Sequence, residues 1–530
     1  MSRREPKFSY WQDAPTPRDQ LVLIPTALEA LIPPDHPVRL VDEILNEMDW
    51  SHWESAYHGS FGKPPIHPSV LAKTLLFAMI RRIRSSRQIE YELKHSIDFM
   101  WLTSGRKIDH TTLSEFRRKH TSELRGIFRQ MIQLAIDLKL ANLSELCIDG
   151  TRVLADANKY KTWTTDRLSR ALEQLDGQIA EALENLEVVD SLDEDLLGQD
   201  TSADRLPAAI GDLKARRAQL AAHRETTKQM DTLRKKNGTK GPGQLPKADP
   251  ESRILPNKEG GYAANYTPMA TTETELGMIV SAEVVIGNVE HDQFTEIVNT
   301  VQADFGVEVN RVLADSAYTR GENLAAAQEM NIELLGPLAE TKSKNNPALR
   351  EDPTQPVAAE LIDDLPIYSQ TKRFDKTAFV YDQSSDCYYC PAGKPMPHRI
   401  TYGTGKPTER RVYACDDCTG CPLADQCVRK SDKAGRELID NIHEPLRRAH
   451  RRLMATDEAK ESYKRRQHFG ELPFAVTKAI FDLRRFLLRG IEGVGQEWRW
   501  ASTAFNLKKL MSVWAVVRQS LRENNETATV

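Results

Sequence analysis

Two short apolar runs that each end at an aspartate place the strongest limit on the fold of this 530-residue chain. The apolar run Leu146–Ile148 leads into Asp149. The predicted strand Val309–Ala314 ends in the apolar run Val312–Ala314, which leads into Asp315. Short apolar runs bounded by turn residues predict buried strands. The apolar runs that follow predict the order strand, strand, strand, helix, strand, helix, strand. In a mixed sheet of this order the first and fourth strands can lie side by side, which would bring the two aspartates together.

The predicted sheet is interrupted twice. From Thr165 to about Lys236 leucines and isoleucines recur at helical spacing, which predicts an antiparallel helical hairpin. Residues 164–210 contain 12 acidic and 3 basic residues, which argues against DNA contact by that half of the hairpin. The second interruption, residues 340–455, holds most of the cysteines, and residues 458–515 are predicted to be helical and basic.

The N-terminal region is predicted to be helical and basic. Residues 63–130 contain 14 Lys or Arg and 6 Asp or Glu. A third short helix, with Thr112 and Glu115 as its capping box, runs into Arg117 and Arg118. Short helices with a basic face predict a helix-turn-helix-like domain that binds DNA through these two arginines. A helical bundle with a solvated basic surface is the alternative.

Three carboxylates are candidate ligands for a metal: Asp149, Asp315 and Glu471. An aspartate at a strand end is commonly a turn or helix cap. Three converging carboxylates, however, cost free energy unless cations neutralise them, and hard oxygen ligands suit Mg²⁺ or Mn²⁺. Two such ions activate the attacking oxygen and stabilise the leaving oxygen of a phosphodiester.

Glu471 is predicted to begin a late helix, because Pro473 is tolerated only where a helix starts or kinks. Lys478 lies seven residues further on, so it shares a helix face with Glu471. Tyr463 and Arg466 precede them. Such a face would hold a metal at Glu471 and a DNA phosphate at Lys478, whereas an exposed Glu–Lys surface is the alternative.

Six of the seven cysteines lie between Cys387 and Cys427. Cys-x-x-Cys pairs separated by this distance predict a structural Zn²⁺ site of four thiolates. Six thiols exceed four, so the ligand set stays open. The ligands are four of Cys390, Cys415, Cys418, Cys421 and Cys427, and the set without Cys415 is preferred. An iron–sulfur cluster and a metal-free loop are the alternatives.

The net charge of −4 excludes a uniformly basic nucleic-acid-binding protein. The first residues carry no apolar signal segment, and no run of about 18 apolar residues occurs. We therefore expect a cytoplasmic protein without a membrane partner, associated with the nucleoid when bound to DNA.

A series of short motifs follows one order along the chain: His67–Leu71, Asp109–Arg117, Ile148–Thr151, Ala314–Tyr318, Tyr463–Arg466, Glu471–Phe474, Lys478, Arg485–Gly490 and Asn506–Leu510. Together they resemble the bacterial insertion-sequence transposases of the DDE class, in the group with a Tyr-Arg-Glu-Lys signature. Two features depart from that pattern. The Arg-to-Glu spacing is one residue longer, which leaves Arg465 as an alternative to Arg466, and Gly470 replaces an apolar residue.

The resemblance implies an RNase H-like core with Asp149, Asp315 and Glu471 as the catalytic triad. It implies that Tyr463, Arg466 and Lys478 assist DNA binding and strand transfer, and it supports a Cys-rich insert ahead of Glu471. The partners would be double-stranded DNA, namely the terminal inverted repeats and the target. Cutting two ends in one event implies a homodimer.

We therefore predict an α/β protein with an RNase H-like mixed-sheet core. Its predicted parts are an N-terminal helical DNA-binding domain (1–140), the first part of the core (141–160 and 246–340), a helical-hairpin insertion (161–245), a Cys-rich zinc insertion (341–455) and the completion of the core with C-terminal helices (456–530). The predicted function is metal-dependent DNA cleavage and strand transfer by an insertion-sequence transposase. A non-catalytic, zinc-stabilised DNA-binding regulator and a hydrolytic nuclease on the same core are the alternatives.

Overall fold

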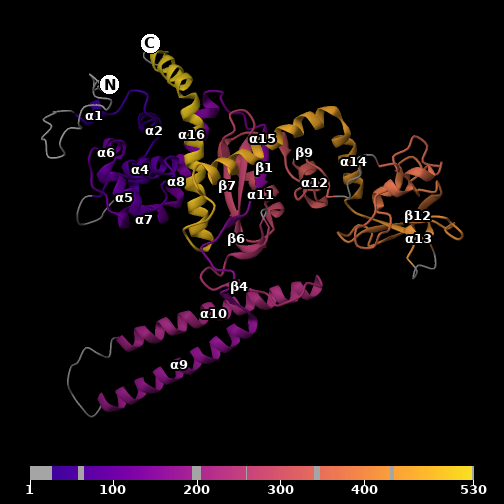
Figure 1. Cartoon of the computed structure of the whole chain (residues 1–530), viewed down its shortest axis with the longest axis horizontal. Helices are drawn as coiled ribbons and strands as arrows, with labels where there is room; N and C mark the ends of the chain where they lie inside the picture. The colour runs from indigo at the N-terminus through magenta and orange to yellow at the C-terminus, as the bar shows by residue number, and fades with distance from the viewer. Residues whose placement is uncertain are drawn as a thin grey trace, which may run out of the picture.

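The computed structural model describes residues 27–57, 65–193, 205–257, 260–339, 346–429 and 435–527. Within these ranges the protein is mixed α/β (Figure 1). Helix α16 (Gly490–Thr527) stands between the N-terminal helices and the main sheet, a helical hairpin projects from the body, and a β-rich lobe lies at the far end. None of the described helices is both long and apolar enough to cross a bilayer.

The main sheet is built around a central strand, β1 (Glu145–Gly150). β1 pairs antiparallel with β6 on one side and parallel with β8 on the other, and β8 pairs parallel with β9. The first and fourth predicted strands are therefore neighbours, as expected. The other strands of this sheet are β2 (Val153–Leu154), β5 (Arg253–Pro256), β6 (Tyr262–Glu273), β7 (Ile279–Val285), β8 (Arg311–Leu313) and β9 (Glu333–Leu335).

The middle of the central strand is apolar because helices cover the sheet. Leu146, Cys147 and Ile148 are fully buried, which is why β1 reads as a continuous apolar run and not as an alternating one. The connections between the parallel strands carry α11 (Phe294–Phe305) and α12 (Gly321–Glu329). Gly306 ends α11 in the left-handed conformation that glycine adopts at low cost.

The N-terminal region is a packed set of helices: α1 (Leu28–Leu31), α2 (Pro37–Asn46), α3 (Ser51–Ser55), α4 (Pro68–Ile80), α5 (Ser86–His95), α6 (Ile97–Leu102), α7 (His110–Arg118) and α8 (Thr121–Asp137). The predicted capping box of α7 is wrong. Asp109 caps this helix by accepting a hydrogen bond from the Thr112 amide, so the helix begins earlier than the Thr112–Glu115 pair suggested.

α16 joins these helices to the sheet. Trp498 Nε1 donates to the Met269 carbonyl in β6, and Trp500 Nε1 donates to the Arg117 carbonyl in α7. Asn506 both donates to and accepts from the backbone of Ile279 in β7. The apolar side chains of the N-terminal helices, the sheet and α16 form one continuous core.

The hairpin consists of α9 (Thr165–Asp193) and α10 (Arg205–Lys236), which lie side by side and project from the body (Figure 1). Its root is a two-stranded ribbon of β3 (Thr162–Trp163) and β4 (Leu245–Pro246).

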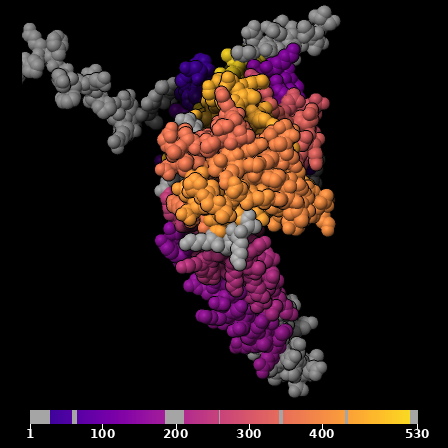
Figure 2. Space-filling view, turned by 90° about the vertical axis from the view of Figure 1, so that its right-hand side faces the viewer, coloured from indigo at the N-terminus to yellow at the C-terminus, as the bar shows by residue number. Residues whose placement is uncertain are grey.

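The β-rich lobe has a separate apolar core and forms the outer end of the molecule (Figure 2). Its five-stranded antiparallel sheet comprises β10 (Val380–Asp382), β11 (Cys387–Tyr389), β12 (Pro395–Tyr402), β13 (Arg410–Ala414) and β14 (Glu437–Asn441). The short helices are η1 (Glu290–Gln293) beside α11, and η2 (Ala359–Asp364), η3 (Lys376–Ala378) and α13 (Ala424–Cys427) in the lobe. Helices α14 (Glu444–Ala455) and α15 (Asp457–Ala479) lead from the lobe back to the sheet.

Candidate functional site

The two predicted aspartates lie at one edge of the main sheet. In the parallel register between β1 and β8, Leu146 is opposite Val312 and Cys147 is opposite Leu313. Continued two residues past the last pair, the same register sets Asp149 level with Asp315, which lies just beyond the end of β8. The carboxyl ends of neighbouring parallel strands thus bring the two carboxylates to the same place, as the apolar runs predicted.

Both aspartates are held by the local backbone. Asp149 is 8% exposed, and its Oδ1 accepts a hydrogen bond from the Gly150 amide at 2.8 Å. Asp315 is half-buried, and its Oδ1 accepts from the Ala317 amide at 2.8 Å. These bonds fix the orientation of each carboxylate at the strand end.

Helix α15 crosses the end of β1 at very short range. A Cβ atom at Gly470 would lie 3.1 Å from Cys147 Sγ and 3.4 Å from Asp149 Oδ2. One turn earlier, Cys147 Sγ lies 3.8 Å from the Arg466 carbonyl oxygen. A side chain at position 470 would push the helix away from the strand. This explains why a glycine replaces the apolar residue that the resemblance led us to expect.

The structure distinguishes the two neighbouring arginines. Arg466 is directed at the site, with its Nη2 atom 3.2 Å from Asp149 Oδ1. Arg465 points to the opposite end of β1, where its Nη1 atom lies 2.9 Å from Glu145 Oε1 and its Nη2 atom donates to the Thr274 carbonyl. Of the two, Arg466 is therefore the one that adjoins Asp149.

The prediction that Glu471 begins a helix is wrong. α15 begins at Asp457 and continues through Pro473, so Glu471 lies in its interior. Proline lacks the N–H that would pair with the carbonyl four residues earlier, but here the helix tolerates this loss. The Glu471 side chain is exposed. It lies on the stretch of α15 between Gly470, which contacts Asp149, and Lys478, whose Nζ donates to Thr151 Oγ1 at 2.6 Å.

Tyr463 is half-buried on the inner face of α15. Burial raises the pKa of its phenol; the Arg466 cation opposes this rise, and the carboxylates of Asp315 and Asp149 add to it. The phenol therefore stays protonated at neutral pH and can donate a hydrogen bond.

One residue that sequence reasoning missed adjoins the aspartates. Tyr318 is 1% exposed, and within the described residues its hydroxyl has no hydrogen-bond partner. Burial raises the pKa of this phenol, and the Glu290, Asp315 and Asp149 carboxylates raise it further. Its place at the end of the Ala314–Tyr318 motif, beside Asp315, was the only signal in the sequence.

Neither predicted metal site is assembled as a ligand set. Among the described residues, no group of three or more His, Cys, Asp or Glu side chains is arranged so that it could hold a metal ion. At the sheet edge, Asp149 is paired with Arg466 and Glu471 is exposed to solvent. Within the described residues, neither the predicted Zn²⁺ ligands nor the three carboxylates are thus arranged as a formed metal site.

Five of the six clustered cysteines nevertheless face one another. A cavity of about 20 Å³ in the lobe is lined by Cys390, Cys415, Cys418, Cys421 and Cys427, but not by Cys387. A hydrogen bond from Cys415 lowers the pKa of the Cys390 thiol to about 7. The Lys394 amide lies 3.4 Å from Cys390 Sγ, and the Arg436 amide lies 3.5 Å from Cys418 Sγ.

The two arginines predicted to bind DNA differ in exposure. Arg118 is on the surface. Arg117 is 8% exposed, and its Nη1 donates to the Arg84 carbonyl beneath α16 at 2.6 Å. The buried position of Arg117 contradicts a direct DNA contact by this side chain in the described conformation, because the surface it would need is covered by packing.

Two family models match the chain. The Transposase DDE domain matches residues 389–511, a range that includes Tyr463, Arg466, Glu471 and Lys478. The DUF772 transposase domain matches residues 26–119, which cover helices α1 to α7. No curated protein matches the sequence.

Two separate segments of the chain are thus similar to transposase domains, one in the N-terminal helices and one from the lobe to α16. Together the two matches support an insertion-sequence transposase of the DDE class, the group that the short motifs resemble.

Proposed function

We propose that the protein binds the ends of an insertion sequence and catalyses metal-dependent DNA cleavage and strand transfer. The observation that carries this proposal is the register of β1 and β8, which sets Asp149 level with Asp315 beneath the helix that bears Glu471. The strand order β7-β6-β1-β8-β9, with the first three antiparallel and the last three parallel, supports an RNase H-like core.

The predicted division into parts belongs to the same proposal. The core would comprise residues 141–160, 246–340 and 456–530, interrupted by the hairpin (161–245) and the Cys-rich lobe (341–455). Residues 1–140 would bind the element ends, with Arg118 as the exposed contact. Cleavage at two ends would require a homodimer on the DNA.

Asp149, Asp315 and Glu471 are proposed as ligands of Mg²⁺ or Mn²⁺. When bound, such ions would activate the attacking oxygen and stabilise the leaving oxygen of the phosphodiester. Ion binding requires Arg466 to release Asp149 and Glu471 to turn toward the sheet edge. Arg466 would then be available for a DNA phosphate, since a guanidinium binds phosphate as readily as carboxylate.

Tyr463 and Lys478 are proposed to position the DNA. The Lys478 ammonium group donates to the Thr151 hydroxyl, just beyond Asp149. A phosphate next to the scissile bond would lie at this place. The protonated Tyr463 phenol would donate a hydrogen bond to the backbone of the strand being cut.

For the lobe, we propose one structural Zn²⁺ bound by four of Cys390, Cys415, Cys418, Cys421 and Cys427. Support comes from the shared cavity, which is about the size that one water or ion needs. The two N–H groups near sulfur would stabilise thiolates.

The test is cleavage and joining of labelled DNA that carries the element's ends, in the presence of Mg²⁺. Wild type should cut and join, whereas Asp149→Ala and Asp315→Ala should bind the ends and do neither. Cutting without joining would replace the transposase by a hydrolytic nuclease. Binding without cleavage in wild type would replace it by a regulator.

A further inference from the structure

The root of the hairpin carries a strong positive charge. Residues 158–165 and 230–248 contain seven Lys or Arg and one Asp. The positive charge is concentrated in six side chains that we call the root lysines: Lys159, Lys161, Lys235, Lys236, Lys240 and Lys247. Five of them are exposed and Lys159 is half-buried. Within the described ranges, none of the six forms an ion pair with an acidic residue.

Hydrogen bonds hold the segments that carry the root lysines. The Lys247 amide donates to the Lys161 carbonyl at 2.8 Å, which ties the two strands of the root together. Arg234 donates to the Lys240 and Gly241 carbonyls and so folds the return loop onto the last turn of α10. The one acidic residue, Asp231, is occupied by the Gly243 amide and the Thr165 hydroxyl. With one acidic residue against seven basic ones, the root keeps a net positive charge.

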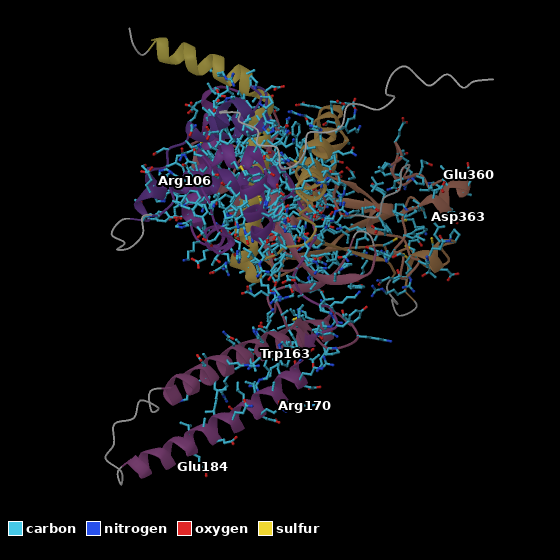
Figure 3. All side chains as sticks on the ribbon, turned by 60° about the vertical axis from the view of Figure 1, so that its left-hand side comes forward. Arg106, Trp163, Arg170, Glu184, Glu360 and Asp363 are labelled. Atoms are coloured by element: carbon cyan, nitrogen blue, oxygen red, sulfur yellow. The ribbon has the colours of Figure 1, made fainter. Side chains whose placement is uncertain are left out.

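The charge reverses along the hairpin. Beyond the root, α9 presents Glu173, Asp176, Glu181 and Glu184, and Arg217 of α10 is paired with Asp176. Figure 3 shows Trp163 at the root, Arg170 on the first turns of α9 and Glu184 toward the far end. The positive charge is therefore densest where the hairpin meets the body, although α10 also carries Lys214, Arg216 and Lys228 further out.

This root lies beyond the same edge of the sheet as Asp149. β1 pairs with β6 so that Asp149 is opposite Ala270, and β2 continues in the same direction and the same register, with Val153 opposite Tyr266. Ten residues separate Asp149 from Lys159, which limits their distance to about 36 Å. Lys159 therefore lies within about one turn of a DNA duplex from Asp149.

Two of the root lysines lie against aromatic rings. Lys247 Nζ lies 4.0 Å from the centre of the Trp163 ring, and Lys159 Nζ lies 5.1 Å from that of Tyr160, which is 79% exposed. These contacts orient the two ammonium groups without neutralising them.

We propose that the root lysines bind the phosphate backbone of the DNA duplex that occupies the Asp149–Asp315 edge, on the side of the scissile bond that faces the hairpin. The inference rests on the proposed function, because it takes the DNA at that edge as given. DNA carries negative phosphates at a regular spacing, so a group of lysines without ion-pair partners is suited to bind it. Contact with the backbone alone would add affinity without selecting sequence.

The test compares two charge-matched variants in the non-cleaving Asp149→Ala parent. The root variant is Lys236→Gln with Lys240→Gln. The control, Lys214→Gln with Arg216→Gln, removes two exposed charges from the outer part of α10. The probe is a labelled duplex of mixed sequence, and the measured quantity is the slope of log Kd against log salt concentration.

Each lost phosphate contact lowers this slope by about 0.9, so the root variant should lose about 1.8. Between about 50 and 200 mM salt, its affinity should then fall about 12-fold less than that of the parent. The control and the charge-conserving Lys236→Arg with Lys240→Arg should keep the parent slope. An unchanged slope in the root variant, or an equal loss in the control, would overturn the inference. A parent without any affinity for DNA would instead reject the proposed function and the inference with it.

Discussion

Gly470 of α15 and Asp149 of β1 are in contact without an intervening side chain: a Cβ atom at position 470 would lie 3.4 Å from Asp149 Oδ2. The helix backbone itself therefore forms one wall beside the carboxylate. The distance between the helix that carries Glu471 and the strand that carries Asp149 is set by the absence of a single methyl group.

Gly470→Ala should lower the cleavage rate by about 10- to 100-fold, because a displacement of well under 1 Å at a reacting group is costly. Its stability should change little, since the gain of about 1 kcal/mol in helix propensity offsets the crowding. Single-turnover cleavage and thermal unfolding measure the two effects. Gly495→Ala in α16, where a Cβ atom would have no neighbour within 4 Å, is the matched control and should retain full activity. Full activity in Gly470→Ala would show that the close approach is not needed.

Arg466→Ala should lower cleavage by about 10²- to 10³-fold, the usual effect of removing one donor that stabilises developing charge. Arg466→Lys should recover only part of this, because lysine lacks the planar fork. Arg465→Ala is the neighbouring control. It breaks a partly exposed pair with Glu145, which contributes about 0–1 kcal/mol, so the rate should stay near that of wild type. Equal losses in both variants would contradict the assignment of Arg466 to the site.

Tyr463→Phe should lower the rate while leaving the pH dependence unchanged. Burial raises the pKa of this phenol above its ordinary value of 10.0. A group with a raised pKa is still protonated throughout the neutral range, so no titration of Tyr463 contributes to a pH–rate profile there. Rates measured across that range in both proteins provide the comparison. If an activity rise toward alkaline pH disappeared in the variant, the tyrosine would be titrating as a base.

The lobe gives a prediction about metal content. Protein purified without chelator should contain about one Zn²⁺ per chain. Cys418→Ser should lose the metal and lower the unfolding temperature of the lobe, because structural zinc contributes directly to folding. Cys387→Ser should retain it, because Cys387 does not line the cavity shared by the other five. Elemental analysis measures zinc in the three proteins. A wild-type protein without zinc would exclude the proposed site, and a Cys418→Ser protein that kept its zinc would leave the other four cysteines as the ligands.

Arg84→Ala should destabilise the protein by about 3–5 kcal/mol, the cost of leaving a buried charge unpaired. Arg84 Nη2 lies 2.5 Å from Glu497 Oε1, and the Glu497 side chain is 1% exposed. Arg518→Ala is the control in the same interface, since its pair with Glu43 is exposed and contributes about 0–1 kcal/mol. Denaturant unfolding, followed by tryptophan fluorescence, measures both. A loss no larger than that of the control would show that the Arg84–Glu497 pair does not stabilise the interface.

The elements with a strong local period were predictable. Leu146–Ile148 and Val312–Ala314 are apolar because both faces of their strands are covered, and the alignment of Asp149 with Asp315 follows from strand order. The regular spacing of leucines likewise indicated α9 and α10, since each helix buries one face against the other.

What the sequence did not reveal depends on contacts between distant segments. Arg117 looks like a surface cation within its own helix, and only the packing of α16, which begins at Gly490, buries it. Pro473 suggested a helix start because its local cost is visible, whereas the tertiary packing that holds α15 together is not. The choice between Arg465 and Arg466 depends on which end of β1 each reaches.

The single core shared by the N-terminal helices, α16 and the sheet has a geometric consequence. If the N-terminal helices bind a particular DNA sequence and the sheet edge cuts the DNA, α16 keeps these two parts of the protein at a constant separation. The number of base pairs between the recognised sequence and the cut would then be a property of the protein, measured by the length of one helix.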